Sequence, residues 1–243
     1  MPILGIIGGS GYASWGQPEE TSKLETPYGE PSSNIGTYRQ NDSQIIFIAR
    51  HGNPHLIPPH RVNYRANIWA LAHYQVDHVL GLNAVGGISA AMVPGQLVLP
   101  DQLVDYTWGR NHTYPNTAAD SVRHIEFANP YHGPLRRALV SAASRAGIDI
   151  VDGGTLGVTQ GPRLETAAEI QRMQKEGCDL VGMTGMPEAA LARELHLDYA
   201  SLCIVTNRAA GLSEQPVSTQ EIEHCLSETR PVVEALIDAL QLY

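Results

Sequence analysis

The segment Ile3-Leu4-Gly5-Ile6-Ile7-Gly8-Gly9-Ser10-Gly11 sets the architecture of the chain. An apolar run followed at once by glycines is typical of a buried strand that opens into a flexible loop. The loop lacks the third glycine of a dinucleotide-binding fingerprint, and Trp15-Gly16-Gln17-Pro18 does not open the helix that such a site needs. A nicotinamide cofactor is therefore not expected. The loop forms either a plain turn or a cradle in which backbone N–H groups and the Ser10 hydroxyl hold a small anion.

Short apolar runs alternate with helical patterns along the rest of the sequence. Strands are expected near residues 35–39, 44–49, 78–82, 96–99, 179–183 and 199–206, the first two as a hairpin around Asn41-Asp42. Helices are expected over 61–74, between Pro134 and Gly147, from Thr166 to Gly177, from Pro187, and from about residue 219. Thr166 and Glu169 form a capping-box pattern. This alternation predicts an α/β protein with a mostly parallel sheet covered on both faces.

Composition narrows the class of protein. The 243 residues contain no repeat or obvious linker, so we expect a single domain over residues 1–243. A formal net charge of −9 opposes a broad attraction to nucleic acid. No run of about 18 apolar residues is present, the start of the sequence lacks a signal-peptide pattern, and the three cysteines form no CxxC pair. We therefore expect a soluble cytoplasmic protein with no nucleic-acid or membrane partner.

Polar and small residues follow several of the expected strands. Arg50-His51-Gly52 comes directly after the strand near 44–49, and arginine offers a fixed fork of donors that suits phosphate. Residues 83–87 and 183–188 form two further loops of small residues, the second leading into a helix. Open α/β sheets bind ligands at the carboxyl ends of their strands, so these loops could converge on one anion. Each taken alone is equally compatible with surface residues at a strand exit.

Three histidines also invite a metal hypothesis. His51, His55 and His60 are spaced by four and five residues in a proline-rich segment. This spacing matches no established zinc pattern, so no metal site is predicted.

Several sequence blocks together resemble a known family. They are Gly5 to Gly11, Arg50-His51-Gly52 with His55, Val62 to Leu71, Gly161-Pro162-Arg163, and Met183-Thr184 with Pro187-Glu188-Ala189. In this order and over nearly the whole chain, they resemble the methylthioadenosine phosphorylase branch of the trimeric purine nucleoside phosphorylases. The resemblance implies a single-domain nucleoside phosphorylase fold with a central mixed β-sheet flanked by helices, and a homotrimer. It also implies phosphate, sugar and base subsites along one cleft, with inorganic phosphate as co-substrate and no cofactor.

The resemblance assigns roles to individual residues. Phosphate would be bound by Ser10, Arg50, His51, Asn83, Ala84 and Thr184, where Ser10 and Asn83 replace the threonines usual in the family. Met183 would pack under the ribose, His55 would lie near the 5′ substituent, and His124 would reach a neighbouring subunit's site. Leu164 and Ala209 would also contact the substrate. The catalytic residues would be His51 and Asn207.

Two departures from the family pattern concern the purine. Methylthioadenosine phosphorylases typically carry Phe-Ser and Asp where this chain has Leu164-Glu165 and Asn207. The Glu and Asn resemble those with which phosphorylases of inosine and guanosine hold a 6-oxopurine, although drift in loops is the alternative explanation. Thr219 stands where the methylthioadenosine enzymes tend to place valine near the 5′ group, so we expect it to influence specificity.

The expected reaction is phosphorolysis of a 6-oxopurine nucleoside in purine salvage. S-methyl-5′-thioinosine is ranked first, with hypoxanthine and S-methyl-5-thioribose 1-phosphate as products. Inosine or guanosine is the second choice of substrate and methylthioadenosine the third. A nucleoside-binding sensor without turnover is the alternative from outside the enzymes.

Overall fold

One sheet organises the part of the chain that the computed structural model describes, which is residues 2–40, 43–114 and 123–242. Its strands are β1 (Ile3–Gly8), β2 (Glu20–Ser22), β3 (Ile35–Gln40), β4 (Ser43–Ala49), β5 (His78–Gly87), β6 (Leu97–Leu99), β7 (Gln102–Asp105), β8 (Ile150–Asp152), β9 (Thr155–Val158), β10 (Leu180–Gly182) and β11 (Asp198–Arg208). The helices are α1 (Tyr64–His73), α2 (Pro134–Ala146), α3 (Ala167–Lys175), α4 (Glu188–Glu194) and α5 (Thr219–Asp238), with a 3-10 turn at Pro59–Arg61.

The sheet is mixed, as the family resemblance implies. Its main path runs β2-β3-β4-β1-β5-β10-β9-β7, and β11 lies against both β5 and β6. Strand β1 pairs in parallel with β4 and β5, and β5 pairs in parallel with β11. The predicted hairpin is present as antiparallel β3 and β4, while the turn expected at Asn41-Asp42 lies outside the described residues. Strand β10 also runs antiparallel to β5, so the sheet is mixed at its centre as well as at the β3–β4 edge.

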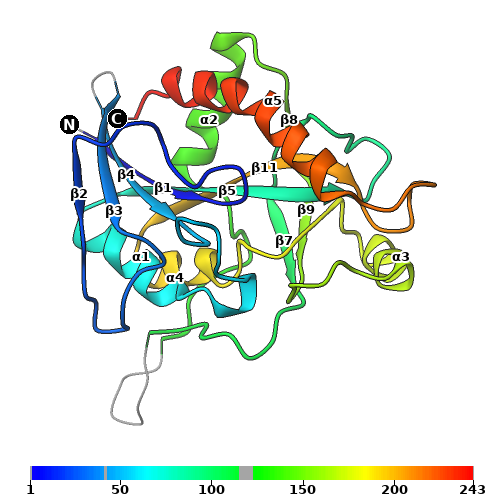
Figure 1. Cartoon of the computed structure of the whole chain (residues 1–243), viewed down its shortest axis with the longest axis horizontal. Helices are drawn as coiled ribbons and strands as arrows, with labels where there is room; N and C mark the ends of the chain where they lie inside the picture. The colour runs from blue at the N-terminus through cyan, green and yellow to red at the C-terminus, as the bar shows by residue number, and fades with distance from the viewer. Residues whose placement is uncertain (1, 41–42, 115–122, 243) are drawn as a thin grey trace.

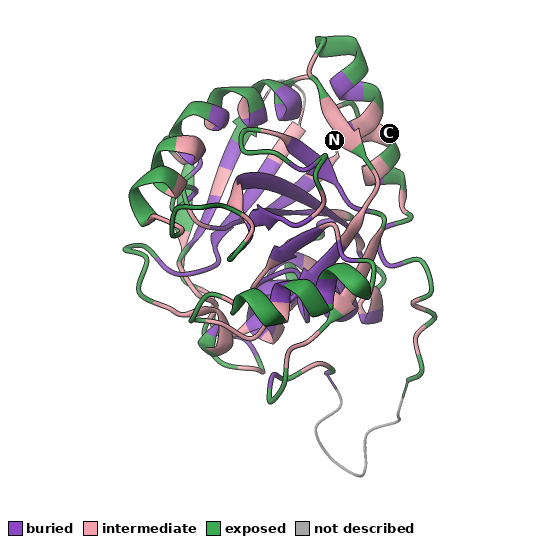
Figure 2. Ribbon diagram, turned by 90° about the vertical axis from the view of Figure 1, so that its right-hand side faces the viewer, coloured by how far each residue is buried: buried purple, intermediate pink, exposed green. Residues whose placement is uncertain are grey.

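Helices cover both faces of the sheet (Figure 1). Helices α2 and α5 pack together on one face, and α1 and α4 pack together on the other. The buried side chains accordingly form two main apolar clusters, one on each side of the central strands. Figure 2 shows the central strands buried and the outer faces of the helices exposed. Among the described helices, none is both long and apolar enough to span a membrane.

Some boundaries differ from the sequence prediction for physical reasons. Helix α1 begins at Tyr64 rather than residue 61, because Pro58 and Pro59 start a separate 3-10 turn and the Asn63 side chain caps the helix by accepting from Ala66 N. The segment 83–87 is not a loop, because β5 continues through it alongside β11. The short strands β2, β7, β8 and β9 were not predicted, since three or four residues carry too little periodicity.

Helices α3 and α2 are capped in different ways: α3 by residues of its own first turn, and α2 by a residue that is distant in the sequence. The predicted capping box of α3 is confirmed, with Thr166 Oγ1 accepting from Glu169 N and the Glu169 carboxylate accepting from Thr166 N. Helix α2 instead begins after Gly133, which has no side chain to cap it. Asp198 supplies the acceptor from the start of β11, because its Oδ2 accepts from Leu135 N at 2.6 Å. The same oxygen lies 2.9 Å from His78 Nδ1, so this carboxylate joins α2, β5 and β11.

We expect Asp198→Ala to lower the free energy of unfolding by about 1–2 kcal/mol, because the Leu135 N–H then loses its acceptor at the start of α2. Chemical denaturation followed by circular dichroism measures this loss. Asp198→Asn is the matched control, since its amide oxygen can still accept and should recover much of the stability. Equal losses in the two variants would contradict the capping role.

Candidate active site

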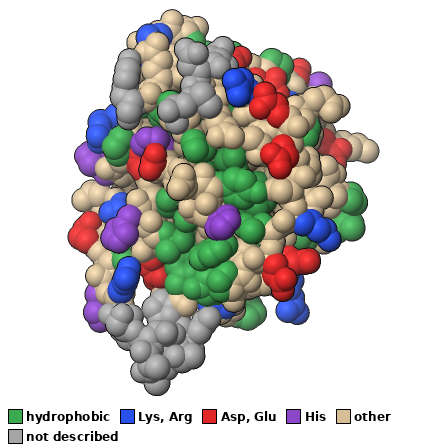
Figure 3. Space-filling model, turned by 90° about the vertical axis from the view of Figure 1, so that its left-hand side faces the viewer, with side chains coloured by type: hydrophobic (Ala, Val, Ile, Leu, Met, Phe, Trp, Pro, Cys, Tyr) green, Lys and Arg blue, Asp and Glu red, His purple; other side chains and the backbone are tan. Residues whose placement is uncertain are grey.

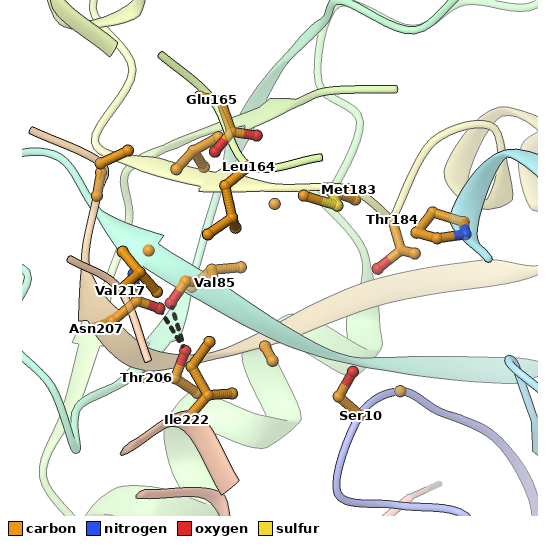
Figure 4. A pocket seen from close by; sticks show the side chains of 18 of the residues that line it. Ser10, Val85, Leu164, Glu165, Met183, Thr184, Thr206, Asn207, Val217 and Ile222 are labelled. Carbon is orange, nitrogen blue, oxygen red and sulfur yellow. Dashed lines mark hydrogen bonds between the residues drawn. The ribbon is translucent and has the colours of Figure 1, made fainter. Parts of the chain in front are cut away.

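A cavity of about 200 Å³ opens where several strands end (Figure 4). Gly9 and Ser10 follow β1, Arg50 and His51 follow β4, and Met183 and Thr184 follow β10. Residues 84–86 of β5 and 206–207 of β11 complete its floor. The sheet therefore brings residues from distant parts of the sequence to one place, as expected for an α/β protein.

Most of the predicted site residues line this cavity. They are Ser10, Arg50, His51, His55, Ala84, Leu164, Glu165, Met183, Thr184, Asn207 and Ala209. Asn83, His124 and Thr219 are outside this lining set. His124 is exposed in the segment before α2, and Thr219 is exposed on the first turn of α5. Val217 and Ile222, from either side of Thr219, line the cavity instead. No role was predicted for them from the sequence, because side-chain direction at a helix start depends on how the helix docks.

Arg50 is completely buried and held by three hydrogen bonds to two partners. Its Nε and Nη2 donate to the two carboxylate oxygens of Glu188 at 2.5 and 2.9 Å, and its Nη1 donates to the Leu82 carbonyl at 2.8 Å. Tyr199 also donates its hydroxyl to Glu188, at 2.9 Å. Burial alone would lower the pKa of Arg50, but the Glu188 carboxylate outweighs this and raises it. Arg50 is therefore a fixed cation whose charge is already matched, and three of its five N–H groups donate within the protein.

Glu188 is a residue to which the sequence analysis assigned no role. It lies at the start of α4, and it is fully buried together with its partners Arg50 and Tyr199. Its place in the block Pro187-Glu188-Ala189 was the available signal. The partner could not be identified from sequence, because 138 residues separate Glu188 from Arg50.

His51 follows Arg50 and is uncharged at neutral pH. Burial, followed by the neighbouring Arg50 charge, lowers its pKa to about 4. Its Nδ1 lies 2.8 Å from the Ile57 carbonyl, and its ring stacks on that of His55 with centroids 4.4 Å apart. Burial also lowers the pKa of His55. This side of the cavity therefore presents neutral imidazoles rather than cations.

Asn83 acts on the cavity through a neighbour. It is buried beneath the lining, where its Oδ1 accepts from Thr184 Oγ1 at 2.8 Å and its Nδ2 donates to Ser201 Oγ at 2.8 Å. Thr184 lines the cavity, so the described contacts make Asn83 a support for Thr184.

The opposite end of the cavity carries the Asn207 amide and the Glu165 carboxylate (Figure 4). Each of them is held by the hydroxyl of a nearby threonine. Thr206 Oγ1 donates to Asn207 Oδ1 at 2.8 Å, and Asn207 Nδ2 donates to the Arg208 carbonyl at 2.8 Å. These two bonds fix which way the amide points, leaving one N–H and one lone pair. Glu165 accepts from Thr159 Oγ1 at 2.7 Å and retains acceptor capacity on its carboxylate.

Metal binding has no support from side-chain clustering. Within residues 2–40, 43–114 and 123–242, no group of three or more His, Cys, Asp or Glu side chains could hold a metal ion. The absence of a metal or cofactor from the reaction stays a prediction.

Fold and cavity together define a class: an α/β protein whose cavity carries a guanidinium and a hydroxyl at one end and an amide and a carboxylate at the other. The family model described as "Phosphorylase superfamily" matches residues 3–241, and the chain belongs to this family.

Relatives with curated names agree with this assignment. The chain is 47% identical over 239 residues to a probable S-methyl-5′-thioinosine phosphorylase of Pseudomonas syringae pv. tomato, covering 98% of this chain and 97% of that protein. It is 41% identical to the 6-oxopurine nucleoside phosphorylase of Pyrococcus furiosus, covering 100% of this chain and 93% of the relative. Among solved structures, the methylthioadenosine phosphorylase of Schistosoma mansoni in complex with adenine superposes with a TM-score of 0.93 at 32% identity, covering 98% of this chain and 90% of that one.

We expect Glu188→Ala to lower the free energy of unfolding by about 3–5 kcal/mol, because the Arg50 charge is left buried without its carboxylate. Tyr199→Phe is the matched control, since it removes one hydrogen bond from the same carboxylate and should lower stability by about 1.5–3 kcal/mol. Urea denaturation of the two variants measures both effects. A Glu188→Ala protein as stable as the wild type would show that the ion pair is not needed.

Proposed function

We propose that the protein catalyses phosphorolysis of 6-oxopurine nucleosides, with S-methyl-5′-thioinosine as its principal substrate. The products would be hypoxanthine and S-methyl-5-thioribose 1-phosphate. The observation that carries the choice of base is the pairing of Glu165 with Asn207 at one end of the cavity. The relative from Pseudomonas syringae, whose name specifies this nucleoside, supports the choice of sugar.

The anion-binding end of the cavity supports phosphate as the second substrate. Ser10 brings a hydroxyl and Arg50 brings a fixed guanidinium. Thr184, whose own hydroxyl donates to Asn83, lies in the lining together with the Gly9 and Ala84 backbones. Such an arrangement holds an oxyanion by directed hydrogen bonds rather than by net charge. This suits a protein whose formal charge is −9 and which would repel an anion at long range.

The donor and acceptor pattern at the other end supports a 6-oxopurine. Hypoxanthine offers an N1–H donor and an O6 acceptor, whereas adenine offers an N1 acceptor and an N6 donor. The oxygens of the Glu165 carboxylate accept hydrogen bonds, so they complement N1–H and oppose the lone pair of adenine N1. The free N–H of Asn207 can donate to O6 while its Oδ1 accepts from N7–H once that nitrogen is protonated.

The proposed mechanism is a direct displacement. Phosphate held beneath C1′ attacks as the bond to the purine breaks, inverting the configuration at C1′ without a covalent enzyme intermediate. The protein contributes by aligning the two reactants and by stabilising negative charge on the departing base through Asn207. Met183 would pack under the ribose between the two ends, as its position beside Thr184 in the lining suggests.

The 5′ substituent separates the first candidate from the second. Val217 and Ile222 give the cavity an apolar wall near the entry to α5, which favours a methylthio group over a hydroxyl. Inosine or guanosine phosphorolysis is the second candidate, because the Pyrococcus furiosus relative is named for 6-oxopurine nucleosides in general. The homotrimer, the contribution of His124 to a neighbouring site and the cytoplasmic location stay predictions.

A substrate panel tests the proposal. We expect rapid release of hypoxanthine from S-methyl-5′-thioinosine, slower cleavage of inosine and guanosine, and little cleavage of adenosine or methylthioadenosine, measured by chromatography of the free bases. All cleavage should stop when phosphate is omitted. Cleavage that continues in phosphate-free buffer would indicate a nucleosidase, and binding without any product would indicate a sensor.

Exchange of the two base-contacting residues should reverse the preference. A hydrogen-bonding site can reject a mismatched partner by about 10⁴-fold, so we expect kcat/KM for methylthioinosine to exceed that for methylthioadenosine by a ratio of this order. Asn207→Asp places an acceptor opposite O6 and should lower that ratio by about 10-fold or more. Adding Glu165→Ser should lower it further, because the carboxylate that opposes adenine N1 is then gone. An unmodified protein that cleaves both nucleosides equally fast would refute these roles.

A further inference from the structure

The hydrogen bond made by His51 fixes which of its ring nitrogens carries the proton. Nδ1 lies 2.8 Å from the Ile57 carbonyl oxygen, which can only accept, so Nδ1 must be the donor. Because the ring is neutral at neutral pH, Nε2 then holds a lone pair and no hydrogen. His51 therefore presents a hydrogen-bond acceptor, not a donor, to whatever lies next to Nε2.

Nε2 is the ring nitrogen of His51 that is not engaged by the Ile57 carbonyl. Among the described residues, Nε2 has no hydrogen-bond partner. It is also absent from the fully buried polar atoms that lack a partner. His51 is only 6% exposed, and it lines the cavity together with Arg50 and Ser10. Because Ile57 engages Nδ1, Nε2 is the ring nitrogen left for a ligand that binds beside Arg50 and Ser10.

The charges around His51 do not turn it into a donor. Arg50 is adjacent, but its charge is matched by Glu188 at 2.5 Å and it disfavours a second positive charge on the imidazole. His55 stacks flat on the His51 ring, its own pKa lowered by burial. Arg50, Glu188 and His55 thus surround a neutral imidazole, and none of them supplies a proton to Nε2.

We propose that His51 makes the anion subsite selective for protonated tetrahedral oxyanions, whose own O–H group donates to Nε2. The inference rests on the proposed function for the identity of the anion, which is phosphate. Hydrogen phosphate and hydrogen arsenate carry such an O–H group. Sulfate has the same shape and the same charge as hydrogen phosphate but no proton, so one of its oxygens would face the Nε2 lone pair.

This arrangement also orders the phosphate for reaction. With its proton on the oxygen that faces His51, the other three oxygens are unprotonated, and one of them can form the bond to C1′. The bond between C1′ and the purine nitrogen breaks, its electron pair leaves with the base, and the base takes up a proton from water. The phosphate proton stays where it is, so His51 acts by holding the nucleophile in one orientation.

Calorimetric titration of the free protein with three dianions tests the inference. At slightly alkaline pH, hydrogen phosphate, sulfate and monofluorophosphate all carry two negative charges, and only the first has an O–H group. We expect phosphate to bind about 10- to 100-fold more tightly than either of the others. The reason is that an unprotonated oxygen or a fluorine of the other two anions would face the Nε2 lone pair, and neither can donate to it. Sulfate or monofluorophosphate binding within about threefold of phosphate would overturn the proposal, whatever the nucleoside specificity.

Two variants separate selectivity from affinity. His51→Gln should bring the phosphate-to-sulfate ratio to within about threefold, because an amide can turn its NH₂ toward an unprotonated oxygen. Ser10→Ala is the matched control, since it removes a hydroxyl that serves either anion and should weaken both while leaving the ratio unchanged. A His51→Gln protein that keeps the wild-type ratio would overturn the proposal.

Two further observations keep the inference independent of that variant's folding and of the proposed reaction. In ¹⁵N-histidine NMR of the wild type, the His51 Nε2 resonance should be that of an unprotonated nitrogen and should shift with phosphate but not with sulfate. A protonated Nε2 would overturn the proposal. Selective phosphate binding without nucleoside cleavage would defeat the proposed function alone, whereas phosphorolysis inhibited by sulfate at concentrations near the phosphate KM would defeat this inference alone.

Discussion

The buried ion pair between Arg50 and Glu188 is the contact on which the site depends. It joins the end of β4 to the start of α4, and through the Leu82 carbonyl and the Tyr199 hydroxyl it also holds β5 and β11. A charge removed from water is tolerated only when its hydrogen-bond partners are well placed. The packing of these four elements is therefore coupled through the ion pair. The same requirement reaches the backbone, because a Cβ on Gly81 would lie 2.1 Å from the Tyr199 hydroxyl.

The pair has an electrostatic consequence for the anion end of the cavity. Arg50 brings directed N–H groups but little net charge, since Glu188 already compensates it, and burial together with Arg50 keeps His51 neutral. On the proposed function, an anion would therefore be recognised by the positions of donors and acceptors. Recognition of this kind depends on shape and protonation state more than on charge, and it can operate inside a protein that carries a net charge of −9.

The sequence predicted the parts of the structure that depend on local pattern. Strand β1, the hairpin, the capping box at Thr166 and the polar residues after β4 all follow from runs, spacings and residue types within a few positions. The partner of Arg50, the burial of Asn83 behind Thr184, and the choice of Val217 over exposed Thr219 as a lining residue depend on how distant elements dock. Those features are set by tertiary packing, which a local pattern does not encode.

The two ends of the cavity are supported independently, and this separation bears on how specificity can vary. Glu165 is held by Thr159 and Asn207 by Thr206, each through the hydroxyl of a residue close in sequence, whereas Arg50 and Thr184 are held across the sheet by Glu188 and Asn83. A change at the base end therefore alters local hydrogen bonds and leaves the buried ion pair untouched. The protein's relatives include proteins named for methylthioinosine and for 6-oxopurine nucleosides, and a methylthioadenosine phosphorylase has the same fold. On the proposed assignment of the two ends, a fixed anion end and a locally supported base end would allow one scaffold to serve all three.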